Sequence, residues 1–207
     1  MTVRRVLQVH TWYRQAGGED QVVEAERRLL EGAGIEVRQV RFDNADLREA
    51  RSLRGDAALA IDAIWSRGAR TRVAAEVAAF SPDIMHVHNT FAAASPSVYA
   101  AANDAGVPVV QTLHNYRLVC PSATAYRDGH ACTDCVGLPL PLPGVAHSCV
   151  RGSRAQSLAL AALLVTHRAV GTWRRRVDAW IVLTAFQREL VVRGGVPRSE
   201  EHTSELQ

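Results

Sequence analysis

The chain has 207 residues, a formal net charge of +3 and 47% hydrophobic side chains, which is enough apolar content for a packed core. No apolar run reaches the length of a membrane span, and the N-terminus lacks a signal-peptide pattern, so we expect a cytoplasmic protein. All 24 basic residues are arginines, which excludes a Schiff-base lysine and a Walker-type phosphate loop. The small, dispersed charge does not favour nucleic acid as a partner.

Apolar periodicity predicts strands that alternate with helices along most of the chain. Strands are expected at residues 4–9, 35–42, 84–87, 107–113 and 177–184, and helices at residues 22–30, 57–80, 95–105 and 155–173. This alternation predicts an α/β fold with a doubly wound, mostly parallel, Rossmann-like sheet. Residues 119–150 break the rhythm with prolines and cysteines, and we expect them to form an insertion on the ligand side.

Two of the expected strands end in histidines. Residues 83–89 place His86, His88 and Asn89 at the end of one strand, and His114 and Asn115 follow the next. In an open parallel sheet the carboxyl ends of the strands form the ligand crevice, so we expect these side chains to face a binding site. Histidines buried within the strand are the alternative.

Several short motifs, taken in order, resemble the N-terminal, acceptor-side domain of the retaining glycosyltransferases of family four, which have the two-domain GT-B architecture. They are the Gly17-Gly18-Glu19 loop, the 83–89 strand, the run 112–117 continuing into Cys120-Pro121, the block 151–154 and the strand 177–184. The resemblance covers residues 1–197 and implies a single Rossmann-like domain there. It also implies transfer of a sugar, with retention, from a nucleotide sugar to a glycan or lipid-linked acceptor, as in polysaccharide biosynthesis.

The resemblance assigns roles to particular residues. Gly17 and Gly18 would approach the donor diphosphate, because residues without a side chain let the amides of a helix start come close to an anion. An ordinary tight turn is the alternative. His114 would be the catalytic residue, facing the donor sugar and its phosphate. The acceptor cleft would be lined by Glu19, His86, His88, Asn89 and Asn115. Catalysis itself is expected to need no cofactor beyond the nucleotide sugar as co-substrate.

All four cysteines lie in the irregular insertion. The CxxC pair can chelate one metal ion, and the other two thiols would complete a tetrahedral four-sulfur site suited to zinc. Four thiolates leave no open position, so such a zinc ion would serve structure. Structural or redox-active thiols are the alternative, with His130 and His147 as substitute ligands if a metal binds. The expected zinc ligands are Cys120, Cys132, Cys135 and Cys149.

The segment from Arg151 to Arg176 interleaves basic and apolar residues, including His167 and Arg168. Such a segment suits an anionic membrane surface or a lipid phosphate, so peripheral contact with the inner face of the membrane is one expectation. A solvated helix face is the alternative.

The resemblance predicts that a linker into a second Rossmann-like domain, which carries the nucleotide pocket, follows Pro197. Residues 198–207 instead resemble one reading frame of a short-read sequencing adapter. We therefore expect a truncated product in which residues 198–207 are disordered and foreign to the natural protein. The fragment alone is expected to have little or no transferase activity.

Two other functions compete with sugar transfer. A metal-dependent hydrolase could use His86, His88 and His114 as ligands, but the sequence offers no nearby carboxylate beyond Asp83. A non-catalytic, zinc-stabilised binding module is the other alternative. The lack of lysine, and of aromatic residues among the basic ones near the cysteines, argues against nucleic acid as its ligand.

Overall fold

The computed structural model describes residues 2–13, 17–44 and 53–197. The chain divides into two compact units, each treated separately below. Unit 1 comprises Met1–Thr112 and Arg176–Trp180, and unit 2 comprises Leu113–Arg175 and Ile181–Gln207. The expectation for residues 198–207 lies outside the described residues, and a single domain over residues 1–197 stays an expectation.

Five strands form a parallel sheet in the order β2-β1-β3-β4-β7. The strands are β1 (Arg5–Trp12), β2 (Glu36–Asp43), β3 (Ile84–Asn89), β4 (Val109–Leu113) and β7 (Ala179–Val182). The predicted doubly wound, Rossmann-like α/β fold is therefore confirmed. The strand after β1 in sequence lies on one side of it and the later strands lie on the other, so the order reverses between β1 and β3. In open α/β sheets, ligands bind outside the carboxyl ends of the strands at such a switch point.

The helices agree only in part with the expected ones. They are α1 (Gly18–Gly32), α2 (Leu53–Ile64), α3 (Arg67–Phe80), α4 (Ser97–Asn103), α5 (Leu142–Ala146), α6 (Arg154–Ala169), α7 (Thr172–Arg176) and α8 (Ala185–Arg193). The prediction of one helix over residues 57–80 was wrong, because Ser66 interrupts it. The Ser66 hydroxyl accepts a hydrogen bond from the Ala69 amide and caps α3, while the Ser66 amide donates to Ser95 Oγ.

Two further differences lie near the C-terminus. The helix expected over residues 155–173 is divided at Gly171, whose positive φ of 67° ends α6 before α7 begins. Helix α8 was not predicted at all. It starts at Thr184, whose hydroxyl accepts a hydrogen bond from the Gln187 amide. A threonine followed three residues later by a glutamine is a recognised helix-start pattern, so the signal was in the sequence.

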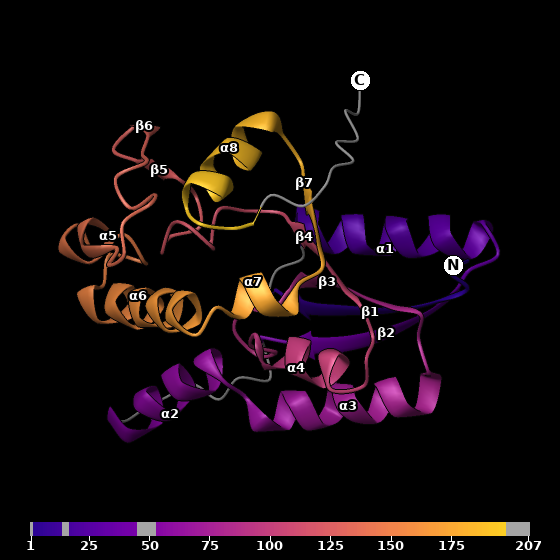
Figure 1. Cartoon of the computed structure of the whole chain (residues 1–207). Coiled ribbons are helices and arrows are strands. Elements are labelled where there is room, and N and C mark those ends of the chain that lie inside the picture. Colours follow the sequence, from indigo (N-terminus) through magenta and orange to yellow (C-terminus); the bar gives the residue numbers. More distant parts are fainter. Residues whose placement is uncertain (1, 14–16, 45–52, 198–207) are drawn as a thin grey trace. The chain divides into compact units, whose positions relative to one another are not determined.

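In unit 1, α1 covers one face of the strands and α3 and α4 cover the other (Figure 1). The face toward α3 and α4 is apolar, and its strand residues are fully buried: Leu7, Val9, Met85 and Val87. Their partners on the helices include Val73, Val77 and Val98, which are also buried. This side of the sheet is an ordinary hydrophobic core and contributes most of the apolar burial that stabilises the unit.

Unit 2 has little regular structure before α6. Between β4 and α6 it contains only the two-residue strands β5 (Tyr126–Arg127) and β6 (His130–Ala131), paired as an antiparallel hairpin, and the five-residue helix α5. The expected irregular insertion at residues 119–150 is thus seen as a series of turns. Among the described helices, none has the length and apolar character needed to cross a bilayer.

Candidate functional site

The face of the unit 1 sheet beneath α1 is polar, in contrast to the opposite face. Side chains alternate along a strand, so the residues next to Leu7, Val9, Met85 and Val87 point toward α1. These residues include Gln8, His10, His86 and His88, all of them buried. Helix α1 supplies carboxylates to meet them. We call this set, with Asp20, Glu26 and Thr112, the buried polar layer.

Asp20 joins the end of β1 to the start of α1. Its Oδ1 lies 2.8 Å from His10 Nε2, and its Oδ2 accepts a hydrogen bond of 2.8 Å from the Gly17 amide. Both side chains are almost fully buried. A carboxylate can only accept, so His10 Nε2 carries the proton. The pair therefore fixes where the loop after β1 enters the helix.

Burial lowers the pKa of His10, and the hydrogen bond with Asp20 opposes that shift only in part. The ring is therefore neutral at pH 7, which leaves Nδ1 as an acceptor. Within the described residues, this buried Nδ1 has no hydrogen-bond partner. The edge of the Trp12 ring packs against His10, with 5.1 Å between centroids.

Glu26 joins α1 to the histidines of β3. Its Oε1 lies 2.6 Å from His86 Nδ1 and 3.6 Å from His88 Nε2, and it also accepts a 3.0 Å hydrogen bond from Gln8 Nε2. His86 Nε2 lies 2.8 Å from Thr112 Oγ1 on β4. Burial opposes ionisation of Glu26, but hydrogen bonds from His86 and His88 outweigh it and hold its pKa below the ordinary value. Glu26 is therefore an anion held beside two imidazoles, whose ring centroids lie 4.2 Å apart with the planes tilted by 34°.

Glu26, His86 and His88 have the composition of a metal site, since one ligand atom from each lies within 4.8 Å of the others. The contacts nevertheless describe a hydrogen-bonded network. Both nitrogens of His86 already face protein partners, and the 2.6 Å contact with Glu26 is a direct hydrogen bond. His114, the third ligand of the hydrolase alternative, belongs to unit 2. Asp83 accepts hydrogen bonds from the Arg4 and Arg5 amides at the amino end of the sheet, away from these histidines.

The expected acceptor residues of unit 1 are mostly buried in this layer. The His88 side chain is 0% exposed and that of His86 is 9% exposed. Asn89 donates to the Thr11 carbonyl and accepts from the Phe91 amide, so it ties the end of β3 to β1. Glu19 is half-buried in the first turn of α1. Direct contact of these side chains with an acceptor stays a prediction.

Gly17 and Gly18 lie at the N-terminus of α1, next to the switch point between β1 and β3. Gly17 precedes the helix with an ordinary extended backbone, and Gly18 is its first residue. A Cβ on Gly18 would meet no atom within 4 Å, and one on Gly17 would only reach Tyr13 at 4.0 Å. Neither the backbone conformation nor internal packing therefore requires glycine here. The absence of a side chain at the first helical residue, Gly18, would let an anion come closer to the start of α1 than a larger residue would allow.

His114 and Asn115 follow β4 at the start of unit 2, and both are half-buried. The Asn115 side chain accepts a hydrogen bond from the Arg117 amide, and its carbonyl accepts one from Gln187 on α8. Asn115 is thus held by two local contacts within unit 2. The catalytic role of His114 stays a prediction.

The four cysteines of unit 2 come together. All four line one cavity of about 20 Å³, although they come from separate turns. Cys135 is buried, the other three are half-buried, and none forms a disulfide. Burial raises the pKa of the Cys135 thiol to about 11. The neighbouring thiols also raise this pKa, while a hydrogen bond with the Gly144 backbone lowers it.

Only some of the basic side chains in residues 151–176 of unit 2 are exposed. His167 is buried and lies 2.9 Å from Thr172 Oγ1. Arg168 donates to the carbonyls of Leu118 and Leu138, so it holds the insertion against α6. The arginines of this segment that remain exposed are Arg151, Arg154, Arg174 and Arg175.

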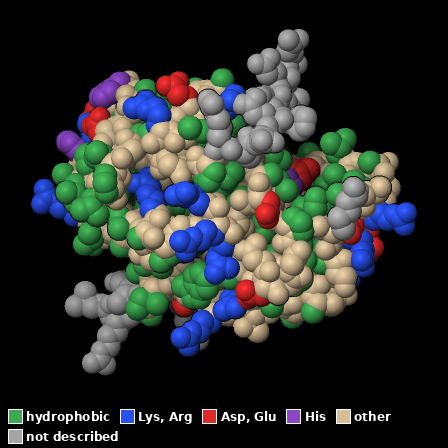
Figure 2. Space-filling model, in the orientation of Figure 1, with side chains coloured by type: hydrophobic (Ala, Val, Ile, Leu, Met, Phe, Trp, Pro, Cys, Tyr) green, Lys and Arg blue, Asp and Glu red, His purple; other side chains and the backbone are tan. Residues whose placement is uncertain are grey.

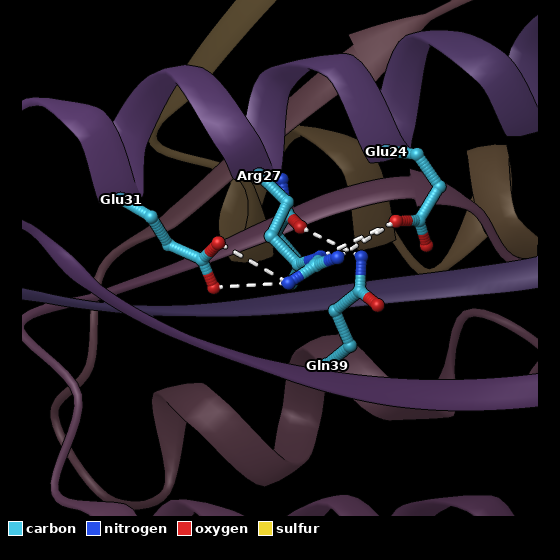
Figure 3. A network of polar contacts seen from close by, with 5 residues as sticks. Glu24, Arg27, Glu31 and Gln39 are labelled. Carbon is cyan, nitrogen blue, oxygen red and sulfur yellow. Dashed lines mark hydrogen bonds and ion pairs between the residues drawn. The ribbon is translucent and has the colours of Figure 1, made fainter.

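Sequence reasoning named only His86 and His88 of the buried polar layer as site residues and missed the other five: Gln8, His10, Asp20, Glu26 and Thr112. His10 was taken as the residue after a strand, whereas β1 continues to Trp12. A usable signal existed on α1, because Asp20, Val23 and Glu26 recur every three residues and so share the buried side of the helix. The exposed side instead carries ion pairs of Arg27 with Glu24 and Glu31, at 3.1 and 3.0 Å (Figure 3).

The fold is that of an α/β protein in which a helix starts next to the switch point of a parallel sheet. The sequence matches the glycosyl transferase 4-like domain over residues 2–203, and the chain belongs to that family. No curated protein matches the chain.

Proposed function

We propose that this chain is the acceptor-side part of a glycosyltransferase that moves a sugar, with retention, from a nucleotide sugar to a glycan or lipid-linked acceptor. Membership of the glycosyl transferase 4-like family supports a transferase in general. The observation that carries the finer proposal is the helix start at Gly17 and Gly18, which lies at the switch point and where a Cβ on Gly18 would meet no atom within 4 Å. The donor diphosphate is the anion that we assign to it.

The remaining roles follow from this assignment. The pair His10 and Asp20 holds the loop, and Glu26 with His86 and His88 fixes α1 on the sheet, so the helix start is rigid before the donor arrives. Preorganised amides stabilise anionic charge without a cost in rearrangement. His114 is the residue that we assign to the donor sugar and its phosphate. The second domain with the nucleotide pocket is part of the proposal.

The proposal is tested by measuring sugar transfer from a panel of nucleotide sugars to lipid-linked and glycan acceptors, with the proposed second domain present in the same protein. Gly18→Ala should lower kcat/KM about tenfold or more, because the new methyl group keeps the diphosphate away from the amides. The melting temperature should not fall, since the methyl group meets no atom within 4 Å and alanine favours a helix.

Gly32→Ala is the matched control at the other end of α1, where a Cβ also meets nothing within 4 Å. It should leave transfer unchanged. His114→Ala should abolish transfer while the protein stays folded. Equal activity of Gly18→Ala and Gly32→Ala would remove the diphosphate assignment, and glycan binding without any transfer would favour a non-catalytic binding module.

We extend the proposal to contact with an anionic membrane, where lipid-linked acceptors are found. In unit 2 the loop before α5 exposes Leu138 and Leu140, α5 begins with the exposed Leu142, and α6 exposes Leu158. Figure 2 shows hydrophobic side chains gathered over α5 and α6, and the exposed arginines Arg151 and Arg154 precede and begin α6. Leucines beside arginines match the acyl region and the headgroups of a bilayer.

Sedimentation with vesicles checks this extension. Vesicles that contain anionic lipid should retain the chain more strongly than neutral vesicles, and the double variant Arg151→Ala/Arg154→Ala should lose most of the difference. Arg70→Ala is the control, because Arg70 is also exposed but lies on α3 of unit 1. Equal binding to both vesicle types would contradict the electrostatic contact.

A further inference from the structure

We propose that Cys120, Cys132, Cys135 and Cys149 bind one structural zinc ion, which orders the insertion of unit 2. The proposal is independent of sugar transfer. The first observation that supports it is that the four thiols lie around the same cavity. The four thiols lie in separate turns, yet all four line one cavity of about 20 Å³, which is the space of about one water molecule. A single ion needs no more room than this.

The chemistry of the cavity favours zinc over harder cations. Among the described residues that line it, the four thiols are the only soft donors, and neither a carboxylate nor an imidazole is present. His130 and His147 are exposed and do not line the cavity, so the structure gives no place to these substitute ligands. Four sulfur ligands select a tetrahedral ion such as zinc, and magnesium or calcium would require oxygen donors.

Short hydrogen-bonded backbone turns place the cysteines around the cavity. The β5–β6 hairpin leads directly into Cys132, whose amide donates to the Ala125 carbonyl, and a turn closed by Val136 and Thr133 carries Cys135. The Cys149 amide donates to the carbonyl of Gly144 within α5. The positions of Cys132, Cys135 and Cys149 therefore depend on one hairpin and two turns, each closed by local hydrogen bonds.

Gly144 shows how closely these turns approach one another. A Cβ at this position would lie 3.0 Å from Pro121 Cγ and 3.4 Å from Cys135 Sγ. Gly144 lies within a helix and its φ is not positive, so the close approach, and not the backbone conformation, accounts for glycine. A side chain here would collide first with Pro121, which lines the same cavity as the thiols.

Arg127 provides the charge that such a centre needs. Zinc with four thiolates has a net charge of −2, and its formation releases four protons from the thiols. The Arg127 guanidinium also lines the cavity, where it would offset part of this charge. It is held in place by ion pairs with Asp134, at 3.0 Å, and Asp128, at 3.3 Å.

The insertion has little else to hold it together. Its regular structure is one short hairpin and one short helix, and several of its leucines are exposed instead of forming a core. Small segments of this kind are usually stabilised by disulfides or by a metal ion. The four thiols form no disulfides in the structure, so a metal ion is the stabilising group that we propose for this segment.

The experiment measures metal in the full chain, purified under reducing conditions without chelators. Elemental analysis should find about one zinc ion per chain. Removal of the metal with a strong chelator should lower the midpoint of thermal unfolding, and added zinc should restore it. Replacement by cobalt(II) should give the absorption bands of a tetrahedral thiolate site, and this readout needs no mutant protein.

The variants Cys135→Ser and Cys149→Ser should lose the bound zinc. His130→Ala and His147→Ala are the matched controls and should keep it, because neither ring reaches the cavity. The proposal is overturned if the purified chain contains no metal while all four thiols react freely with a thiol reagent. Disulfides among these cysteines, or full zinc content in Cys135→Ser, would overturn it as well.

Discussion

The two units of this chain achieve close internal contact in different ways. In unit 1, a Cβ added at Gly17, Gly18, Gly32, Gly34, Gly68 or Gly106 would approach no neighbour closer than 4.0 Å. In unit 2, four glycines are in such contacts, at positions 137, 144, 171 and 194. Unit 1 has regular elements that meet through side chains, including the buried polar layer. In unit 2, the backbone at these glycines lies directly against other segments, which are side chains at three of the positions and the Arg193 carbonyl at Gly137.

The difference shows what each region depends on. A sheet and its helices satisfy their own backbone groups, so the space between them can hold either apolar or hydrogen-bonded side chains. A segment built of turns tolerates fewer changes in its packing, because a few close contacts hold its turns in place. Unit 1 should therefore be sensitive to the loss of polar partners, and unit 2 to added volume.

The largest effect should come from Asp20→Ala in unit 1. This change leaves the buried ring N–H of His10 without its acceptor and removes the acceptor of the Gly17 amide. The free energy of unfolding should fall by about 3 kcal/mol, because a buried polar group that loses its partner is not compensated by water. Equilibrium unfolding in urea measures this loss of stability.

Glu24→Ala is the control on the exposed side of the same helix. Its ion pair with Arg27 is partly solvated (Figure 3), so its loss should cost less than about 0.5 kcal/mol. If the two variants were equally stable, the buried polar layer would contribute no more than a surface pair, and the contrast between the two units would weaken.

A somewhat smaller effect is expected from Gly194→Ala in unit 2. Gly194 ends α8 with an ordinary negative φ, but an added Cβ would overlap Cγ1 of the fully buried Val119. Stability to urea should fall by about 2 kcal/mol as the two segments are forced apart. The double variant Gly194→Ala/Val119→Ala should recover part of the loss if the overlap is its cause.

Gly32→Ala at the end of α1 is the corresponding change in unit 1. A Cβ there meets nothing within 4 Å, so its effect should be neutral or stabilising by less than about 1 kcal/mol. Equal losses at positions 32 and 194 would mean that the loss comes from the helix end in general and not from close packing in unit 2.

The sequence was most informative where elements repeat. The alternation of strands and helices predicted the sheet, and the histidines of residues 83–89 were correctly placed on a strand. Their partner Glu26 was missed because it lies on a helix sixty residues earlier, and no local pattern links the two. Helix α8 was missed although Thr184 and Gln187 mark its start. The convergence of the four cysteines depends on turns whose course no periodicity encodes.

One irregularity in the sheet affects any attempt to rebuild the site. Val9 pairs with Val87, but His10 pairs with Asn89, so β3 contains one more residue than β1 over the same span. Such an extra residue bends a strand and increases its local twist. The loop after Asn89 therefore leaves the sheet along a direction that an evenly paired ladder would not give. A grafted or shortened version that omits the surplus residue would aim that loop elsewhere, even with every other side chain preserved.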